Sequence, residues 1–97
     1  MEGKYVISIN MRKNGNGEPC EIMLYAGVLF NKLYKTNDPC WKYTIAESIC
    51  FNTIEEAKEW YEKAKEGLLN EYCVSKYDFD LSELCIRKIV CEKVESL

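Results

Sequence analysis

The fold is decided by residues 41–68, which read WKYTIAESICFNTIEEAKEWYEKAKEGL. Apolar residues occupy every second position from Trp41 to Phe51, except at Glu47. This period of two predicts a β-strand with one buried face. Glu47 leaves two alternatives open: it lies in water at the margin of the sheet, or a bulge shifts the register there.

An amphipathic helix is predicted directly after this strand. Thr53-Ile54-Glu55-Glu56 has the form of a capping box, so the helix starts at residue 54. Its apolar stripe, which favours packing against a sheet, consists of Ala57, Trp60, Tyr61, Ala64 and Leu68. We place the helix end between residues 66 and 73, because Gly67 favours termination whereas the apolar stripe continues beyond it.

A hairpin is predicted at the N-terminal end. Tyr5, Ile7, Ile9 and Met11 alternate with other residues, as in a half-buried strand. The following Asn14-Gly15-Asn16-Gly17 suits the positive φ angles of a type I′ turn. A second strand then runs from about Cys20 to Ala26. Gly27 is a candidate bulge, and residues 28–34 fit a continued strand, a third short strand or one helical turn.

Two connections and a C-terminal strand complete the expected layout. Residues 36–39 (TNDP) and 75–80 are predicted to be loops by composition. Residues 84–97 fit either a strand or a helix, and their β-branched residues favour the strand. We therefore expect a single α+β domain over residues 1–97. It is an antiparallel β-meander of three to four strands, with one amphipathic helix packed on one face and a C-terminal strand completing the sheet.

The charge balance disfavours nucleic acid as a partner. The chain has 13 Lys and Arg against 16 Asp and Glu, for a net charge of −3. Six basic and four acidic side chains give residues 1–46 a charge of +2, whereas seven and twelve give residues 47–97 a charge of −5. This asymmetry fits an ordinary solvated surface or an acidic half that meets a basic partner.

The six cysteines are expected to be free thiols in a reducing compartment. The N-terminus lacks the features of a signal peptide, and no stretch approaches the ~20 apolar residues that span a bilayer. We therefore expect a cytoplasmic protein with no membrane partner. Without histidine, a zinc site would need four scattered thiols to converge. Cys50, Cys85 and Cys91 are interpreted as small apolar residues inside strands.

The chain offers few means of catalysis. Without histidine, neither a Cys-His nor a Ser-His nucleophile pair can form. The phosphate-binding motifs G-x-x-x-x-G-K-[ST] and G-x-G-x-x-G are absent from the sequence. Asp78, Asp80 and Glu83 fit a magnesium site or, more simply, solvated and capping acids. We expect no enzyme activity, no cofactor and no metal.

Aromatic residues point instead to binding. The chain has seven Tyr, two Trp and three Phe, which are more aromatic rings than the core of one helix on one sheet can enclose. Several of them should therefore lie at the surface, where Tyr and Trp anchor protein interfaces. The alternative is that each ring is half-buried with its polar tip in water. We place the predicted partner-binding residues within the segment 30–43. They are Tyr34, Lys35, Trp41, Lys42 and Tyr43.

The layout also resembles a known group of proteins. The leading Tyr5-Val6-Ile7 strand, the Phe51-x-Thr53-x-Glu55-Glu56-Ala57 connector and a final Ile89-Val90 strand resemble small α+β proteins encoded by bacteriophages and mobile elements. That group includes anti-CRISPR and other anti-defence inhibitors. The resemblance implies a phage-type inhibitor that binds a host protein or nuclease complex stoichiometrically in the host cytoplasm.

Two further hypotheses come from other functional classes. One is a single-stranded nucleic-acid-binding accessory domain, in which aromatic rings stack on bases beside Lys32, Lys35 and Lys42. The other is a structural homo-oligomer, such as a homodimer, in which an exposed sheet edge pairs with its symmetry mate.

Overall fold

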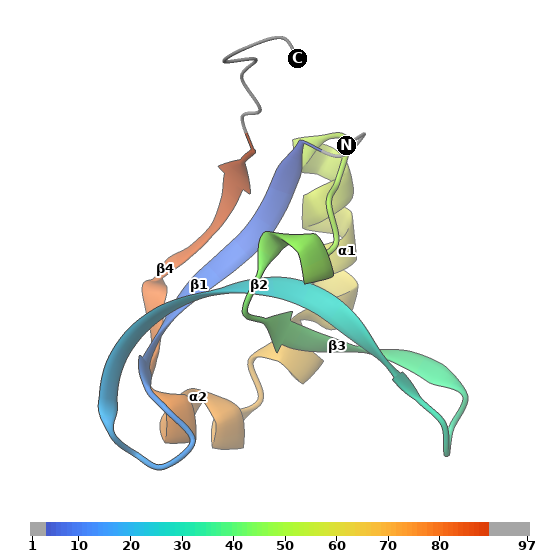
Figure 1. The fold of residues 1–97 in the computed structure, drawn as a ribbon. Helices are drawn as coiled ribbons and strands as arrows, with labels where there is room; N and C mark the ends of the chain where they lie inside the picture. The colour runs from blue at the N-terminus through green and yellow to red at the C-terminus, as the bar shows by residue number, and fades with distance from the viewer. Residues whose placement is uncertain (1–3, 90–97) are drawn as a thin grey trace, which may run out of the picture.

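The computed structural model describes residues 4–89, in which two helices cover one face of a four-stranded antiparallel sheet (Figure 1). The strands are β1 (Tyr5–Lys13), β2 (Pro19–Asn31), β3 (Thr36–Lys42) and β4 (Phe79–Lys88), in the order β3-β2-β1-β4. The two helices are α1 (Ile54–Leu68) and α2 (Glu71–Tyr77), and a 3-10 turn, η1 (Ile45–Glu47), precedes them. The α+β prediction is confirmed.

The central strand β1 is buried on both faces. Ile7, Ile9 and Met11 face the helices, and the alternate residues Val6 and Ser8 are buried on the opposite side. The buried Ser8 hydroxyl accepts a hydrogen bond from Arg87 Nε at 2.8 Å. β1 is thus the scaffold on which both neighbouring strands depend.

Two apolar clusters fill the space between the sheet and the helices. One joins Ile7 and Ala26 to the buried stripe of α1, and the other joins Ile9, Met11 and Phe79 beneath α2. Trp41 packs against both clusters. It therefore connects the two halves of the core.

The strand predicted over residues 41–51 is wrong beyond Lys42. β2 pairs with β1 only as far as Tyr25, and the chain after η1 crosses into the opening between them. There the amide of Ile49 donates to the Ala26 carbonyl at 3.0 Å, and Phe51 forms an isolated bridge with Tyr5. Glu47 lies exposed in η1, so it is in water as the first alternative held, but it is not in a strand, and the bulge is wrong.

Beyond this opening, β2 and β3 continue alone as a projecting hairpin (Figure 1). We call residues 28–38 the arm. The loop predicted over residues 36–39 is wrong, because these residues pair with β2 in unbroken register from Asn31↔Thr36 to Tyr25↔Lys42. That register also excludes a β2–β3 bulge at Gly27, and β2 runs to Asn31 before a turn over residues 32–35.

The other hairpin is confirmed, but its turn is not type I′. Within this turn only Gly17 has a positive φ, at 78°, whereas type I′ needs positive φ at both central residues. The Asn14 side-chain oxygen accepts from the amides of Asn16 and Glu18 at 2.9 and 3.0 Å. This side chain therefore closes a longer turn with Gly17 in the left-handed position.

The helix start at residue 54 is confirmed. Thr53 Oγ1 accepts from the Glu56 amide at 3.1 Å, while the Glu56 carboxylate accepts from the Asn52 amide at 3.2 Å. α1 ends at Leu68, within the predicted range, but Gly67 lies inside the helix. A Cβ at Gly67 would lie 2.7 Å from Pro39 Cγ, so glycine allows α1 to approach β3.

The prediction of a single helix is wrong, and so is the loop predicted over residues 75–80. The Asn70 side chain accepts from the Cys73 amide at 2.9 Å and caps α2. Asp78, with a left-handed φ of 45°, ends α2 and leads directly into β4.

The C-terminal strand is confirmed for residues 84–88 and begins earlier, at Phe79. It lies beside β1 at one edge of the sheet. Cys85 lies in this strand as predicted, whereas Cys50 lies outside any strand. The predictions for residues 90–97, including Cys91, fall outside the described residues. Among residues 4–89, no helix has the length and apolar character to cross a membrane.

The contact between α1 and β3 predicts that Gly67→Ala destabilises the fold. Alanine favours a helix interior by about 1 kcal/mol over glycine, but its Cβ would overlap the rigid Pro39 ring. Overpacking of this kind costs about 1–3 kcal/mol, so we expect a net loss in the free energy of unfolding measured by urea denaturation.

Gly15→Ala is the matched control. A Cβ at Gly15 would have no other atom within 4 Å, and the φ angle of Gly15 is not positive, so we expect a change within about 0.5 kcal/mol. Equal effects of the two substitutions, or a stabilised Gly67→Ala protein, would contradict the close approach of α1 to β3.

Candidate functional site

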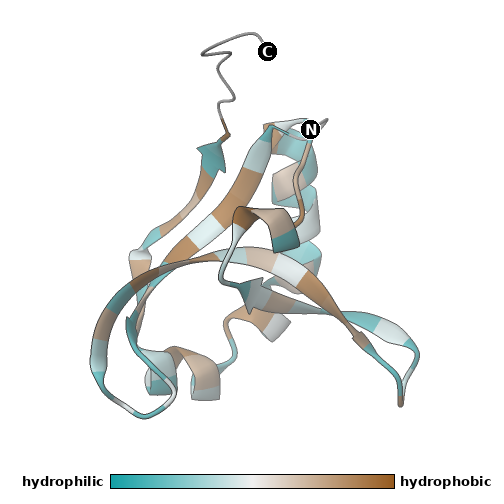
Figure 2. Ribbon diagram, viewed as in Figure 1, coloured by the Kyte–Doolittle hydropathy of each residue, from teal (hydrophilic) through white to brown (hydrophobic). Residues whose placement is uncertain are grey.

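The arm carries large apolar side chains that are open to solvent. The exposed fractions are 61% for Leu29, 56% for Phe30, 79% for Leu33 and 72% for Tyr34. Leu29 and Phe30 are consecutive strand residues and point to opposite faces, so both faces of the arm are apolar. Figure 2 shows apolar colouring along the outer part of β2, where that strand enters the arm.

The polar groups of the same turn are engaged within it. The Asn31 side-chain oxygen accepts from the amides of Leu33 and Tyr34 at 3.0 and 3.2 Å. Asn31 Nδ2 in turn donates to Asp38 at 3.0 Å, and the Thr36 hydroxyl donates to the other Asp38 oxygen at 2.9 Å. The turn thus satisfies its own hydrogen bonds while its apolar side chains face outward.

These hydrogen bonds have an electrostatic consequence for Asp38. Donation from the Asn31 amide, and then from the Thr36 hydroxyl, holds the pKa of Asp38 below its ordinary value of 3.8. The charged carboxylate is therefore the form that closes the turn at neutral pH.

The base of the arm is fixed to the helical layer. Trp41 Nε1 donates to the Leu68 carbonyl at the end of α1, at 3.0 Å, and its ring meets Phe79 edge-on at 6.0 Å. Pro39, two residue pairs farther out, lies against Gly67. The arm therefore leaves the body from an anchored position.

The five predicted binding residues occupy different environments. Tyr34 and Lys35 lie in the exposed turn at the end of the arm, where Lys35 has a left-handed φ of 54°. Trp41 is half-buried in the core. Lys42 is half-buried with its side chain over Gly27, and Tyr43 is 66% exposed beyond the end of β3. The structure thus brings Tyr34 and Lys35 together but separates them from the other three.

Sequence reasoning missed Leu29 and Leu33, and included Phe30 only as the boundary of the segment. A signal was available in residues 28–30, where three consecutive apolar residues break the alternation expected of a half-buried strand. Such a run, when it lies outside a core, is typical of a binding surface.

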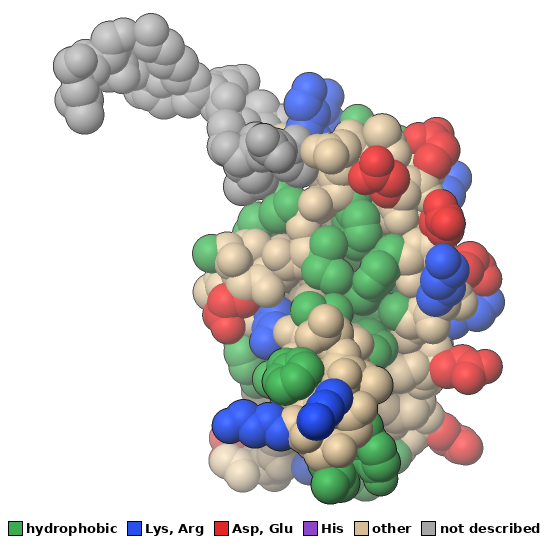
Figure 3. All heavy atoms as spheres, turned by 90° about the vertical axis from the view of Figure 1, so that its right-hand side faces the viewer, with side chains coloured by type: hydrophobic (Ala, Val, Ile, Leu, Met, Phe, Trp, Pro, Cys, Tyr) green, Lys and Arg blue, Asp and Glu red, His purple; other side chains and the backbone are tan. Residues whose placement is uncertain are grey.

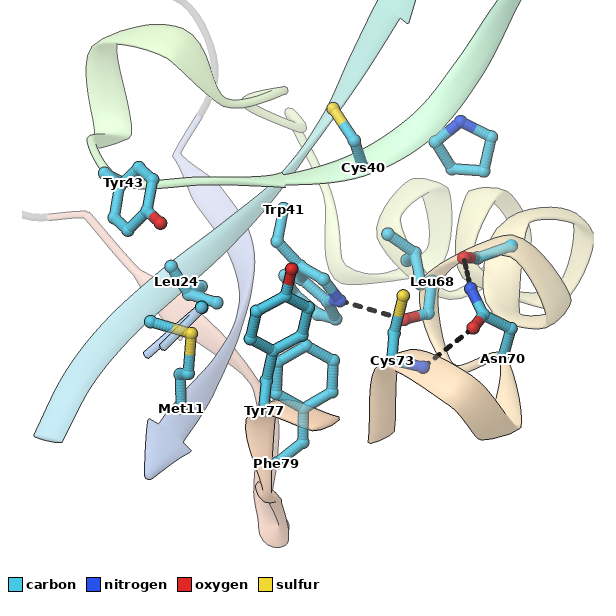
Figure 4. Close-up of a pocket in the computed structure, with 13 residues that line it drawn as sticks. Met11, Leu24, Cys40, Trp41, Tyr43, Leu68, Asn70, Cys73, Tyr77 and Phe79 are labelled. Carbon is cyan, nitrogen blue, oxygen red and sulfur yellow. Dashed lines mark hydrogen bonds between the residues drawn. The ribbon is translucent and has the colours of Figure 1, made fainter. Parts of the chain in front are cut away.

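A pocket of about 410 Å³ lies between the base of the arm, α2 and the end of β1 (Figure 4). The rings of Trp41, Tyr77 and Phe79 stand together at its centre, and Met11 and Leu24 form one wall. Cys73 lies on the opposite side. Asn70, which also lines the pocket, already bonds to the Gly67 carbonyl and the Cys73 amide. The pocket therefore offers mainly apolar and aromatic surface.

The candidate acidic cluster does not converge on one point. Asp78 lies 3.6 Å from Arg12 and Glu83 lies 3.7 Å from Arg87. Asp80 accepts from the Ser82 hydroxyl at 2.6 Å, which lowers the pKa of its carboxyl. Within residues 4–89 no group of three His, Cys, Asp or Glu side chains is arranged to hold a metal ion.

Cys85, Ser8 and Arg87 form the other cluster of reactive or charged side chains. The Cys85 Sγ lies 3.8 Å from the Ser8 hydroxyl, which in turn bonds to Arg87. Arg87 is a donor that cannot act as a base, so this arrangement satisfies a buried hydroxyl without activating a nucleophile. Five free thiols lie among the described residues, at positions 20, 40, 50, 73 and 85.

Comparison of the chain with protein-family models, curated proteins and solved structures finds no match.

We predict that Asn31→Ala loosens the turn of the arm without unfolding the body. The substitution removes the acceptor for two amides, and hydrogen bonds of this kind contribute about 0.5–1.5 kcal/mol each. Amide hydrogen exchange at Leu33 and Tyr34 should accelerate several-fold, with little change at Ile9. Asn37→Ala is the control, since no side-chain hydrogen bond of Asn37 occurs among the described residues; equal acceleration in both variants would contradict the role of Asn31.

The turn should also respond to acid through Asp38. The pKa of Asp38 is lower in the folded protein than its ordinary value. The stability that the charged carboxylate gives to the turn is therefore present above pH 3.8, and it is lost as the pH falls through the folded-state pKa. In an NMR titration, the Leu33 and Tyr34 amide shifts should change with a midpoint below 3.8. They should lose this transition in Asp38→Asn, and a midpoint above 3.8 would contradict the hydrogen bonds described.

Proposed function

We propose that this chain is a non-enzymatic binding protein that associates stoichiometrically with a partner protein through the arm. One observation carries the proposal: four large apolar side chains are exposed on the arm, whose Asn31 and Asp38 side chains already form hydrogen bonds within it. An exposed apolar patch on an ordered element is typical of a protein-binding surface.

The arm is suited to binding for an energetic reason. Association costs free energy when loops and side chains become ordered at the interface, and an element that is already ordered avoids part of that cost. Asn31 and Asp38 hold the turn, and Trp41 holds its base. Tyr34 is a tyrosine, one of the three residue types enriched among the residues that dominate interface energetics.

A catalytic role has less support. The sequence has no histidine, and the pocket beside the base of the arm is lined mainly by apolar and aromatic side chains. Acid-base chemistry would then fall to a carboxylate, a thiol or a lysine at a perturbed pKa. No lysine or acid with a resolved pKa shift lines that pocket.

The class of partner is proposed from the sequence resemblance described above. It suggests a phage-type inhibitor in the host cytoplasm, so a nuclease complex of host defence is the first partner to test. Occlusion by an apolar arm would need no chemical step.

Single-stranded nucleic acid is the second candidate. Tyr34 lies between Lys32 and Lys35 in the sequence and is 72% exposed, an arrangement that suits base stacking beside positive charge. Fluorescence anisotropy with labelled single strands at low and moderate salt tests it. Tight binding that Tyr34→Ala abolishes would favour this function over protein association.

We predict that Leu33→Glu removes partner binding while the fold is kept. Leu33 is 79% exposed, so the substitution should leave the melting temperature nearly unchanged. A charge placed in a desolvated contact should weaken association at least tenfold. Titration calorimetry against purified defence nucleases measures the affinity, with Leu81→Glu as the control, because Leu81 is 53% exposed on β4.

The proposal fails if Leu81→Glu weakens binding as much as Leu33→Glu does. It also fails if far fewer inhibitor molecules than nuclease molecules give full inhibition, because occlusion requires one inhibitor for each nuclease.

A further inference from the structure

The arm raises the question of what covers it in the free protein. Its apolar side chains lie on both faces and at the end, so the described body shields neither face. Figure 3, in which the arm points toward the viewer, shows apolar and basic side chains gathered at the front of the molecule. Surfaces of this kind on a protein without its partner tend to associate.

Edge-to-edge pairing of sheets does not suit this chain. β3 is an edge strand, but Pro39 lies in it and has no N–H to donate to an added strand. At the other edge, β4 is bulged: the register moves from Ser8↔Cys85 to Asn10↔Asp80. Both edges therefore carry features that oppose an added strand, and association must use side chains.

The aromatic pocket is the complementary feature. Its volume of about 410 Å³ lies in the range of pockets that hold a ligand or an inserted side chain. Every buried side-chain nitrogen and oxygen among residues 4–89 already has a partner, so no buried polar group in the pocket is left for a polar ligand. An apolar or aromatic side chain is thus the occupant that the lining favours.

The arm and the pocket share the same strand. β3 contributes Asp38 to the arm and Pro39, Cys40 and Trp41 to the pocket lining. A projection and a hollow that adjoin each other form a self-complementary patch, as a two-fold dimer requires. Each contact would then occur twice, which doubles the apolar area buried by one arm.

The distribution of charge also favours a second copy of this chain as the source of the side chains that fill the pocket. Lys32 and Lys35 give the end of the arm two positive charges, and its one acid, Asp38, is held by Asn31 and Thr36. Residues 54–77, which form the helical layer beside the pocket, carry six acidic and four basic side chains. In a two-fold arrangement the basic end of each arm meets the acidic layer of the other copy.

We infer that in the absence of another partner the chain forms a two-fold homodimer, in which the Leu33 and Tyr34 side chains of each arm enter the aromatic pocket of the second copy. The inference goes beyond the proposed function, because it concerns the chain alone and uses a pocket that the proposed function does not require. Partner binding would then compete with dimer formation for the arm.

Analytical ultracentrifugation over a concentration series tests the dimer. We expect the wild-type chain to shift from monomer to dimer in the micromolar range, and Leu33→Glu to raise the midpoint concentration at least tenfold. Lys32→Glu combined with Lys35→Glu should weaken the dimer by a second route. Leu81→Glu should leave the midpoint unchanged, and circular dichroism confirms that each variant is folded.

Alkylation of Cys73 by iodoacetamide, followed by mass spectrometry, locates the contact. Cys73 lines the pocket, whereas Cys85 lies on β4 and serves as the internal reference. The ratio of Cys73 to Cys85 alkylation should fall several-fold as the wild-type concentration rises through the midpoint, and it should stay constant for Leu33→Glu.

A chain that stays monomeric at high micromolar concentration overturns the inference but leaves the proposed function intact, because binding to a separate partner needs no dimer. A dimer that Leu33→Glu leaves intact, or one that does not protect Cys73, also overturns it. Conversely, a dimer of the expected kind together with no effect of Leu33→Glu on any partner would overturn the proposed function alone.

Discussion

The hydrogen bond from Trp41 Nε1 to the Leu68 carbonyl holds the rest of the structure in place. It joins the edge strand β3 to the last turn of α1, where helix carbonyls lack partners within the helix. The same indole ring packs against both apolar clusters. Without this bond a partly buried carbonyl would lose its partner, at a cost of about 1–3 kcal/mol, and β3 would lose this hydrogen bond to the helical layer.

Because β3 is anchored in this way, β2 can extend beyond the body. β2 leaves β1 after Tyr25, and the opening is filled by residues 49–51, which bond to Ala26 on one side and Tyr5 on the other. The free ends of β2 and β3 then project as a two-stranded hairpin. A lone hairpin is only marginally stable in water, so the internal bonds of Asn31 and Asp38 are needed to keep its turn ordered.

The elements that local chemistry determines were predictable from the sequence. The Thr53 cap and the apolar stripe of α1 each depend on residues close in the chain, and each is found as predicted. The strand β1 is also found, but it is buried on both faces and not half-buried as its alternation predicted. α2 also has a local signal, the Asn70 cap, but the polar composition of residues 75–80 led to the prediction of a loop there. In contrast, residues 43–51 alternate like a strand but form a 3-10 turn and a crossover, because the partners of Ile49 and Phe51, which are Ala26 and Tyr5, are distant in sequence.

The candidate site was likewise predictable only in part from local sequence. Aromatic content drew attention to the segment 30–43, but a ring in the core and a ring at the surface look alike in a sequence. Trp41 lies inward because α1 ends beside it, and Tyr34 lies outward because Asn31 closes the turn beneath it. Only the long-range pairing of β2 with β3 separates the two.

An ordered, projecting arm is tested most directly by backbone ¹⁵N relaxation of residues 29–37 in the free protein. We expect order parameters of about 0.85, equal to those of β1, because both the turn and the base are held. Values below about 0.6 over these residues, with β1 remaining rigid, would describe a flexible loop and contradict an arm prepared for binding.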